Sequence, residues 1–386
     1  MPGKINASLN NKLQAVKWGE FKLGDLFDIE NTLSFNTDKL VHGNDYDYVT
    51  RTSLNQGILT STGFVNKENI NPAGTWSLGL LQMDFFYRSK PWYAGQFVRK
   101  ITPKIRIEES TVLFFTTLFN KQKQKLLSVL VRDVDKVFRS IKIQLPTLNN
   151  RIDFNFMELF IEELKNQKIV KLKAYLNERG FDNYKLSDKE LNAIKDFSKL
   201  NNDNWGSYII GDLFEKVYTK KLPYKAKELP KQPIEDYDLP CLTSSFQNQG
   251  LNYYVPRTEA TVISNVISLP SNSDVYRAYY QSREFTVLSD SYAIRWKSRE
   301  NKPTKNQYLF MVMCINKVTD LPIYSYKNKL GGWNVVKNKK IRLPEKDGKI
   351  DFDLMETFIS ALKKIAIKEV VLHTEKRFKV TKEVIN

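Results

Sequence analysis

The sequence predicts an α/β (α+β) fold built from two copies of one domain, each with a mixed sheet and each closed by a long helix. Residues 18–27 return as 205–214, 187 residues later. Further along, Asn55-Gln56-Gly57 matches Asn248-Gln249-Gly250, and residues 153–158 match 351–356. The order never changes and the interval only grows, so the repeated unit of about 190 residues is a domain, far longer than a solenoid repeat of about 20–50 residues.

Length and composition agree with two globular domains. The chain has 386 residues, of which 41% are hydrophobic and 12% aromatic, enough for a core in each of two domains of about 100–200 residues. Sixty Lys and Arg against 43 Asp and Glu give a net charge of +17. Such an excess favours a polyanionic partner, most often nucleic acid, although a Lys-rich composition can also reflect an AT-rich genome.

A short helix is expected to begin each copy. In the second copy Ser187 and Glu190 form a capping-box sequence, in which each side chain bonds the backbone amide of the other. The apolar residues that follow at helical spacing are Leu191, Ile194 and Phe197. The counterpart in the first copy is the shorter series Leu9, Leu13 and Val16.

The body of each copy follows, over residues 18–146 and 205–344. Short aromatic and β-branched runs broken by Gly, Pro and Asn, such as 76–83 and 262–269, predict strands of a twisted sheet. The stretches expected to form connecting helices are 112–120 and 308–316.

A long helix is expected to close each copy, over residues 153–177 and 351–376. Apolar residues recur there at three- and four-residue spacing without an interior Pro or Gly, and Gly180 stands where a helix C-cap needs it. A helix of about 25 residues is about 38 Å long. The two apolar seams therefore most simply bury each other as an antiparallel, coiled-coil-like pair, although each helix could instead pack on the sheet of its own domain. The residues expected to pair the helices are Met157, Phe160, Leu164, Leu172, Met355, Phe358, Leu362 and Ile365.

These elements divide the chain into four parts. We expect a first domain at 1–148, a first spacer helix at 149–180, a second domain with its leading helix at 181–346, and a second spacer helix at 347–386.

The sequence shows no recognisable catalytic motif. A phosphate-binding GxxxxGK[ST] loop and a GxGxxG fingerprint are both absent. The only cysteines and histidines are Cys241, Cys314, His42 and His373, and they lack metal-binding spacing. We therefore expect a chain with no catalysis, metal or cofactor of its own.

No segment predicts export or membrane insertion. Residues 1–17 lack an apolar run followed by a cleavage site, and no stretch approaches about 18 consecutive apolar residues. A cytoplasmic location is the resulting expectation.

Each body does carry basic residues interleaved with aromatic and amide side chains. Arg and Lys can donate to guanine, Asn and Gln can pair bidentately with adenine, and Ser, Thr and Tyr mostly bond phosphate. Against this, Asn-Gln-Gly is first of all a turn sequence, and a tyrosine such as Tyr280 can belong to the core. The residues expected to contact DNA are Arg51, Thr52, Asn55, Gln56, Arg88, Lys90, Trp92 and Tyr93 in the first copy, and Ser244, Ser245, Gln247, Asn248, Gln249, Tyr280 and Arg283 in the second.

A further segment, 324–329, is expected to clamp the DNA backbone in the second copy. Its candidate contacts are Tyr326, Lys327, Asn328 and Lys329. The first copy has the basic run 121–125 instead. Framework positions thus agree between the copies while the polar groups between them differ, as expected if the two domains recognise two different half-sites.

The ordered motifs resemble the specificity subunits of Type I restriction–modification systems, especially the branch of BcgI-like specificity proteins. The resemblance covers essentially the whole chain. It rests on the Gly-Asp-Leu-Phe motifs at 24–27 and 211–214, on the repeated Asn-Gln-Gly, and on the closing motifs at 145–158 and 343–356. Segment 324–329 resembles the family's Tyr-Ser-Tyr-Gly-Arg-Lys-like stretch, with Asn328-Lys329 where Arg-Lys is common, and the first copy lacks it.

This resemblance implies two recognition domains separated by two antiparallel helices, with pseudo-twofold symmetry. It implies a non-catalytic subunit that binds a bipartite, asymmetric target in double-stranded DNA. Its expected partners are DNA adenine methyltransferase subunits and, in the full complex, a restriction subunit, with S-adenosylmethionine bound by the methyltransferase. Helices of about 38 Å would place the half-sites about one DNA turn apart, ~34–36 Å. Two alternatives stay open: a stand-alone DNA-binding regulator or defence adaptor, and an enzyme of an unrecognised type.

Overall fold

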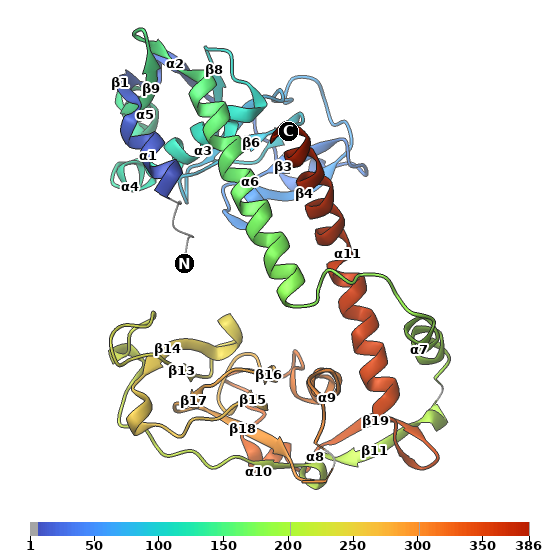
Figure 1. The fold of residues 1–386 in the computed structure, drawn as a ribbon. Coiled ribbons are helices and arrows are strands. Elements are labelled where there is room, and N and C mark those ends of the chain that lie inside the picture. The colour runs from blue at the N-terminus through green and yellow to red at the C-terminus, as the bar shows by residue number, and fades with distance from the viewer. Residues whose placement is uncertain (1–6, 201, 301, 386) are drawn as a thin grey trace. The chain divides into compact units, whose positions relative to one another are not determined.

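The computed structural model describes residues 7–200, 202–300 and 302–385, which form two compact units (Figure 1). The first unit comprises Met1–Ala174 with Thr374–Asn386, and the second comprises Tyr175–His373. Both divisions fall inside long helices, so the units differ from the four parts expected from the sequence. The expected boundaries at 148/149 and 346/347 lie instead at the turns of two hairpins, β9–β10 and β19–β20.

The two units repeat one order of elements. The first contains α1 (Ala7–Ala15), β1 (Lys17–Lys22), α2 (Leu23–Leu26), β2 (Phe27–Asn31), β3 (Tyr46–Val49), β4 (Ile58–Thr62), β5 (Thr75–Gly79), β6 (Asp84–Arg88), β7 (Trp92–Ala94), β8 (Val98–Pro103), α3 (Val112–Lys121), α4 (Lys123–Leu127), α5 (Val134–Ser140), β9 (Lys142–Leu148), β10 (Arg151–Ile152) and α6 (Phe154–Glu178). The second contains α7 (Asp188–Lys199), β11 (Trp205–Ile209), α8 (Ile210–Leu213), β12 (Phe214–Lys216), β13 (Leu239–Leu242), β14 (Leu251–Val255), β15 (Val266–Pro270), β16 (Tyr279–Gln281), β17 (Thr286–Val287), β18 (Ser291–Trp296), α9 (Lys305–Thr319), α10 (Trp333–Val336), β19 (Lys340–Lys346), β20 (Lys349–Ile350) and α11 (Phe352–Ile385).

The sheets have the same topology in both units. The orders are β1-β9-β10, β2-β8-β5-β6 and β4-β3-β7 in the first unit, and β11-β19-β20, β12-β18-β15-β16 and β14-β13-β17 in the second. All named pairings are antiparallel except β3 with β7 and β13 with β17, so the sheets are mixed, as predicted. Trp18 pairs with Pro146, and Trp205 pairs with Pro344. The residues that bound each predicted body thus lie opposite one another in the sheet.

Two strand predictions were too long at one end. The predicted strand 76–83 ends at Gly79, because the chain turns there and Met83 takes a φ of 53°. The predicted strand 262–269 begins only at Val266, after an isolated bridge between Ile263 and Phe285. The connecting helices are α3, which packs on β6, and α9, which packs on β16 and β19.

The repeated Gly-Asp-Leu-Phe motif has a packing explanation. A side chain on Gly24 would lie 2.9 Å from the carbonyl oxygen of Arg139, and one on Gly211 would lie 2.8 Å from that of Lys337. The short helices α2 and α8 therefore approach the neighbouring backbone too closely for any larger residue. The last residue of each motif is fully buried in the core of its own unit.

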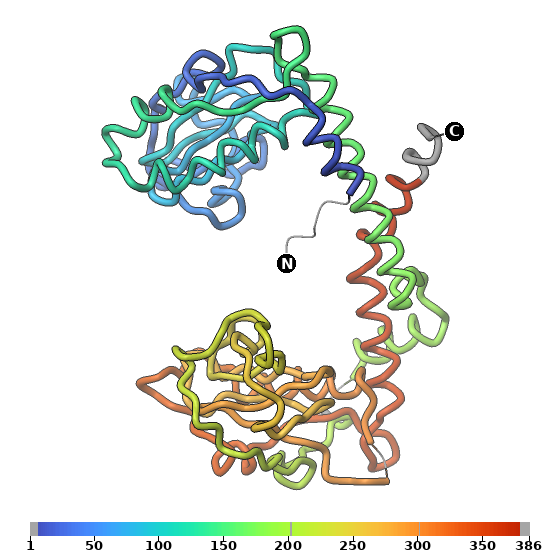
Figure 2. The backbone as a smooth tube through the Cα atoms, turned by 60° about the vertical axis from the view of Figure 1, so that its left-hand side comes forward, coloured from blue at the N-terminus to red at the C-terminus, as the bar shows by residue number. Residues whose placement is uncertain are grey.

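Both long helices are continuous (Figure 2). Gly180 follows α6 with a φ of 65°, and the Phe181 amide donates to the Leu176 carbonyl at 2.8 Å, so the predicted C-cap is confirmed. The capping box of α7 is also confirmed, with the Ser187 amide 2.8 Å from the Glu190 carboxylate. Helix α11 extends to Ile385, beyond the predicted end at 376.

The first turns of each long helix pack on their own unit, which corrects the role predicted for five seam residues. Met157 and Met355 are fully buried in the cores of the first and second units. Phe160 and Leu164 pack with Leu9 of α1. Phe358 stacks on Phe197 of α7, with the ring centroids 4.0 Å apart. These residues follow the alternative in which each helix packs on its own domain, because the leading helix and the core already cover that part of the seam.

The remaining seam residues are more open. Leu172 is half-buried, while Leu362 and Ile365 are exposed. Within the first unit, Nζ of Lys173 on α6 lies 3.8 Å from the ring centroid of Phe378 on α11, so α6 contacts the last part of α11 there.

Candidate nucleic-acid interface

The two Asn-Gln-Gly loops, residues 55–57 and 248–250, have the same backbone conformation. The Asn and Gln φ values are 46° and 55° in the first loop and 47° and 55° in the second, and the glycines follow at 80° and 86°. The Thr50 amide donates to the Gly57 carbonyl at 2.8 Å, and the Thr243 amide donates to the Gly250 carbonyl at 2.9 Å. Three consecutive left-handed residues make the final glycine necessary and place strain on the two residues before it.

Within each loop, asparagine and glutamine have different roles. The carboxamide of Asn55 donates to the Ile58 carbonyl at 3.2 Å, and that of Asn248 donates to the Leu251 carbonyl. Both asparagines therefore close the turn on which they lie. Gln56 and Gln249 are exposed, as the two asparagines are, but their carboxamides take no part in closing the turn, so each loop can offer its glutamine amide to a ligand.

A buried polar residue in each unit bonds the backbone of the Asn-Gln-Gly loop, and in the first unit this residue is Arg88. Nη2 of Arg88 donates to the Gln56 carbonyl at 2.5 Å and to Oγ of Ser77 at 2.6 Å. Burial lowers the pKa of the Arg88 guanidinium to about 10, partly opposed by the nearby Asp47 carboxylate. With only 3% of its surface exposed, Arg88 cannot contact DNA, and the prediction that it does is wrong.

Trp92 and Tyr93 are also corrected from DNA contacts to core residues. Both are fully buried in β7; Nε1 of Trp92 donates to Oγ1 of Thr75 at 3.1 Å, and the Tyr93 hydroxyl donates to the Asn66 carbonyl at 2.8 Å. Their polar atoms are satisfied inside the domain, which removes any need for a ligand. Lys90 lies nearer the surface, where Nζ forms a 2.8 Å ion pair with Asp47.

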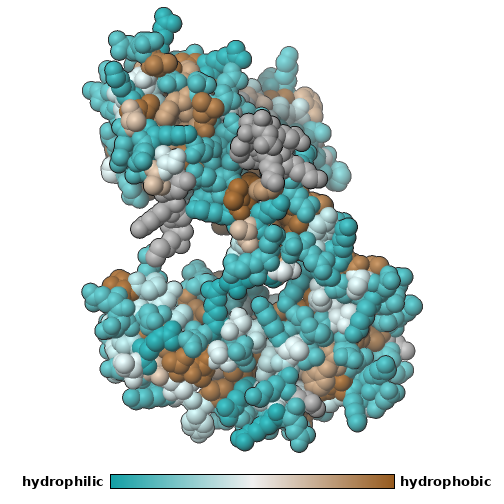
Figure 3. All heavy atoms as spheres, in the orientation of Figure 1, coloured by the Kyte–Doolittle hydropathy of each residue, from teal (hydrophilic) through white to brown (hydrophobic). Residues whose placement is uncertain are grey.

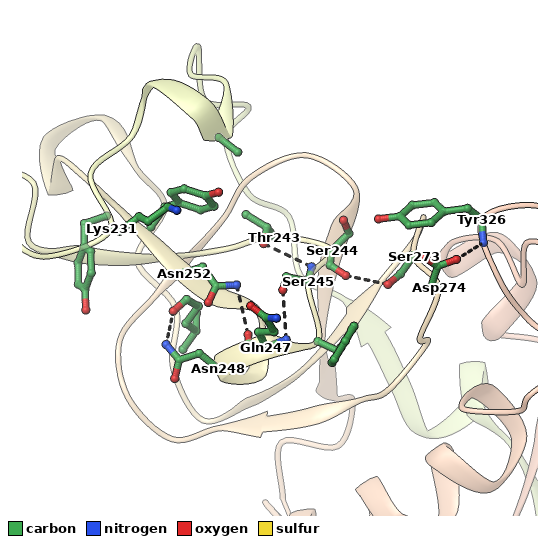
Figure 4. Close-up of a pocket in the computed structure, with 15 residues that line it drawn as sticks. Lys231, Thr243, Ser244, Ser245, Gln247, Asn248, Asn252, Ser273, Asp274 and Tyr326 are labelled. Carbon is green, nitrogen blue, oxygen red and sulfur yellow. Dashed lines mark hydrogen bonds between the residues drawn. The ribbon is translucent and has the colours of Figure 1, made fainter. Parts of the chain in front are cut away.

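In the second unit, two of the predicted segments meet around one open cavity of about 650 Å³ (Figure 4). The Thr243–Asn248 stretch forms one side and Tyr326 another. The backbone amide of Tyr326 donates to the Asp274 carboxylate at 3.1 Å, and Oγ of Ser273 donates to the Ser244 carbonyl at 2.8 Å. These bonds fix the position of the 324–329 segment relative to the Asn-Gln-Gly loop of the same unit.

Several residues that line this cavity were not predicted from the sequence. They are Lys231, Asn252, Tyr253, Tyr254, Ser273 and Asp274. Strand β14 follows the loop directly, so its polar and aromatic Asn-Tyr-Tyr run could have been predicted as part of the site from its proximity to the loop alone. No local pattern links Lys231 or Asp274 to the loop, because only the fold brings those segments together.

The other candidates are exposed or half-buried and make varied local contacts. Arg51 is exposed, with its guanidinium 5.2 Å from the ring centroid of Phe97. Tyr280 is half-buried against the core of the second unit, with its ring stacked on that of Tyr308 at 5.1 Å between centroids, and its hydroxyl donates to the Asn265 carboxamide at 2.9 Å. Thr52, Ser244 and Ser245 are half-buried, and Gln247, Arg283, Lys327, Asn328 and Lys329 are exposed.

The basic run 121–125 of the first unit spans the junction of α3 and α4, whereas segment 324–329 of the second unit is a loop. Lys123 begins α4, and its Nζ lies 2.6 Å from the Asp84 carboxylate. Asp84 also accepts a hydrogen bond from the Ser53 hydroxyl, beside the Asn-Gln-Gly loop. This lysine therefore supports the loop from within the protein.

The described residues contain no group of three or more His, Cys, Asp or Glu side chains placed to hold a metal ion. Burial raises the pKa of both Cys241 and Cys314 to about 12, which keeps these thiols protonated. No helix in the described part of the chain is long and apolar enough to cross a membrane. On the face drawn in Figure 3, hydrophilic residues cover most of the surface of each unit.

The fold and the site define a protein of two duplicated mixed-sheet domains, each presenting a polar loop that a buried side chain holds from the core. Residues 15–174 and 202–373 both match the model of the Type I restriction modification DNA specificity domain, and the chain belongs to this family. The predicted family and the predicted fold of two duplicated α/β domains are thereby confirmed. The family's domains determine DNA specificity, which is a recognition role rather than a catalytic one.

Known proteins resemble the chain over nearly its whole length. It is 22% identical over 349 residues to S.BcgI, the specificity subunit of a Type II restriction enzyme from Heyndrickxia coagulans, covering 89% of this chain and 94% of that protein. The S subunit of a Type I restriction-modification system from M. genitalium aligns with a TM-score of 0.50 at 14% identity, over 99% of this chain and 95% of that one. The HsdS subunit from Thermoanaerobacter tengcongensis aligns with a TM-score of 0.30 at 10% identity, over 97% and 93%.

Proposed function

We propose that this chain is the DNA specificity subunit of a restriction–modification complex. It binds a bipartite, asymmetric target in double-stranded DNA, one half-site to each unit. It directs DNA adenine methyltransferase subunits, and in the full complex a restriction subunit, to that target. The methyltransferase supplies S-adenosylmethionine and the chemistry, and the complex acts in the cytoplasm, where its DNA is.

The observation that carries the proposal is one loop framework surrounded by two different sets of side chains. Arg51, Thr52 and Leu54 precede the first loop, whereas the positions at the same distance before the second are Ser244, Ser245 and Gln247. Guanidinium and amide groups prefer different base edges, so domains with these sets would select different sequences. A backbone kept constant beneath variable polar groups supports two modules with one binding mode and two specificities.

The deciding experiment is a map of methylated adenines in a host without other methylation. The chain is expressed with and without the methyltransferase encoded beside it. A bipartite motif that is methylated only when both proteins are present is the expected result. Absence of modification, with both proteins folded and present, would overturn the proposal in favour of a stand-alone DNA-binding protein. Modification by this chain alone would make it an enzyme.

Alanine at Arg51 or Arg283 should weaken specific DNA binding by about 1–3 kcal/mol if the guanidinium bonds a guanine bidentately. Arg51 lies beside the first loop and Arg283 follows β16 in the second unit, so each variant should relax preference in one half-site only. Titration against DNA libraries randomised in one half-site measures both effects. Arg132→Ala, at an exposed arginine in the Val131–Asp133 turn, is the matched control. Wild-type affinity and preference would remove the tested arginine from the interface.

A further inference from the structure

The last residue of β6 and the last residue of β16 make the same contacts in the two units, although one is arginine and the other glutamine. Gln281 is 4% exposed, and its Nε2 donates to the Gln249 carbonyl at 3.2 Å and to Oγ of Ser268 at 3.1 Å. In the first unit the buried guanidinium of Arg88 bonds the Gln56 carbonyl and Oγ of Ser77. Two side chains of different charge and length therefore reach the same two acceptors.

The serine beneath each of these residues is part of the arrangement. Ser77 lies opposite Phe86 in the β5–β6 pair, and Ser268 lies opposite Tyr279 in the β15–β16 pair. Each serine hydroxyl donates to the carbonyl of the residue opposite it, at 3.5 Å and 3.3 Å, and accepts from Arg88 or Gln281 with its oxygen. Both serines are 1% exposed, so these polar groups are paired inside the protein.

The carbonyl that is bonded belongs to the residue that faces outward. Gln56 and Gln249 each follow a left-handed asparagine and are left-handed themselves, a conformation that a non-glycine residue adopts only where its surroundings impose it. The Asn side chain bonds the carbonyl of the residue that begins the following strand, Ile58 or Leu251. The bond from β6 or β16 ties the carbonyl of this strained glutamine to the sheet, in addition to the bond from the Thr50 or Thr243 amide to the glycine that follows.

We propose that Arg88 and Gln281 are positioning residues for DNA recognition, each fixing the carbonyl of Gln56 or Gln249 and so aiming that glutamine side chain at DNA. The inference rests on the proposed function. Because each residue holds the loop of its own unit, each governs one half-site. The requirement is for a buried donor of the right reach, not for a positive charge, since the second unit uses a neutral amide.

The test uses the complete complex of this chain with its methyltransferase, and DNA libraries randomised in one half-site at a time. Arg88→Met removes the donors at similar length, and we expect it to weaken specific binding about tenfold or more. Sequence preference should be lost in the half-site of the first unit and kept in the other. Arg88→Gln, which places the second unit's own residue in the first, should stay within about threefold of wild type. Gln281→Met should have the opposite effect, with sequence preference lost in the half-site of the second unit and kept in that of the first.

A purely structural role would lower the melting temperature of the Arg88→Met variant while leaving half-site preference unchanged, and that result overturns the inference. If Arg88→Met does not fold, Gln281→Met and Arg88→Gln decide the question in the same assay. Unchanged half-site preference in the Gln281→Met complex also overturns the inference. So does a loss of preference in an Arg88→Gln complex that keeps its fold. A wild-type complex with no bipartite preference would instead overturn the proposed function, which separates the two failures.

Discussion

Phe27→Ala is expected to lower the free energy of unfolding of the first unit by about 3–5 kcal/mol. Phe27 is fully buried at the point where α2 passes into β2. Its ring meets those of Trp76, Phe115 and Phe119 edge-on, with centroids 5.9, 5.5 and 4.8 Å away. Truncation removes these aromatic contacts and leaves a cavity that the surrounding large side chains can fill only in part.

The repeat supplies a matched experiment for this prediction. Phe214→Ala, at the corresponding position of the second unit, removes an edge-on contact with Trp296 at 5.3 Å and should destabilise that unit similarly. Leu54→Ala is the control, since Leu54 is 79% exposed and should change stability by less than about 0.5 kcal/mol. Urea unfolding followed by tryptophan fluorescence measures all three. A loss below about 1 kcal/mol for both phenylalanine variants would contradict the packing described here.

Lys364→Met is expected to cost about 3–5 kcal/mol in the second unit, because it leaves a buried carboxylate without its counter-ion. Glu190 of α7 has 8% of its side chain exposed, and its Oε2 lies 2.9 Å from Nζ of Lys364 on α11. The Ser360 hydroxyl donates to the same carboxylate at 2.8 Å, and so does the Ser187 amide. These bonds join the leading helix to the long helix of the unit. Lys368→Met, at an exposed position one turn further along α11, is the control.

The same ion pair should make stability depend on pH. Burial alone would raise the pKa of the Glu190 carboxyl, but hydrogen bonds from the Ser187 amide, Lys364, Ser360 and the Ser187 hydroxyl lower it from 4.5 to about 2. A folded-state pKa below the unfolded value stabilises the fold above about pH 4.5, and this contribution is lost as the pH falls toward 2. Lys364→Met should raise that pKa and flatten the decline. Urea unfolding from pH 2 to 6 tests this, and parallel curves for wild type and variant would contradict it.

Local chemistry made much of the fold predictable. The capping box at Ser187 and the C-cap at Gly180 involve residues within a few positions of one another, so their sequence is sufficient to specify their structure. The Asn-Gln-Gly turn likewise depends on neighbouring residues. Because the same turn sequence recurs at the matching place in the second copy, it helped to identify the duplicated domain. Family motifs distributed along both copies identified the class of protein.

The sequence alone therefore determined the duplication, the capped helix ends at Ser187 and Gly180, the turn of the loop and the family, because each depends on short-range spacing or on a repeated order of residues. The tertiary structure decided which polar and aromatic side chains face the ligand. Arg88, Trp92 and Tyr93 resemble DNA contacts in sequence, but long-range strand pairing buries them. Asp274 is brought to Tyr326 only by the fold. Burial and convergence depend on contacts between residues far apart in the chain, and residue type alone does not contain that information.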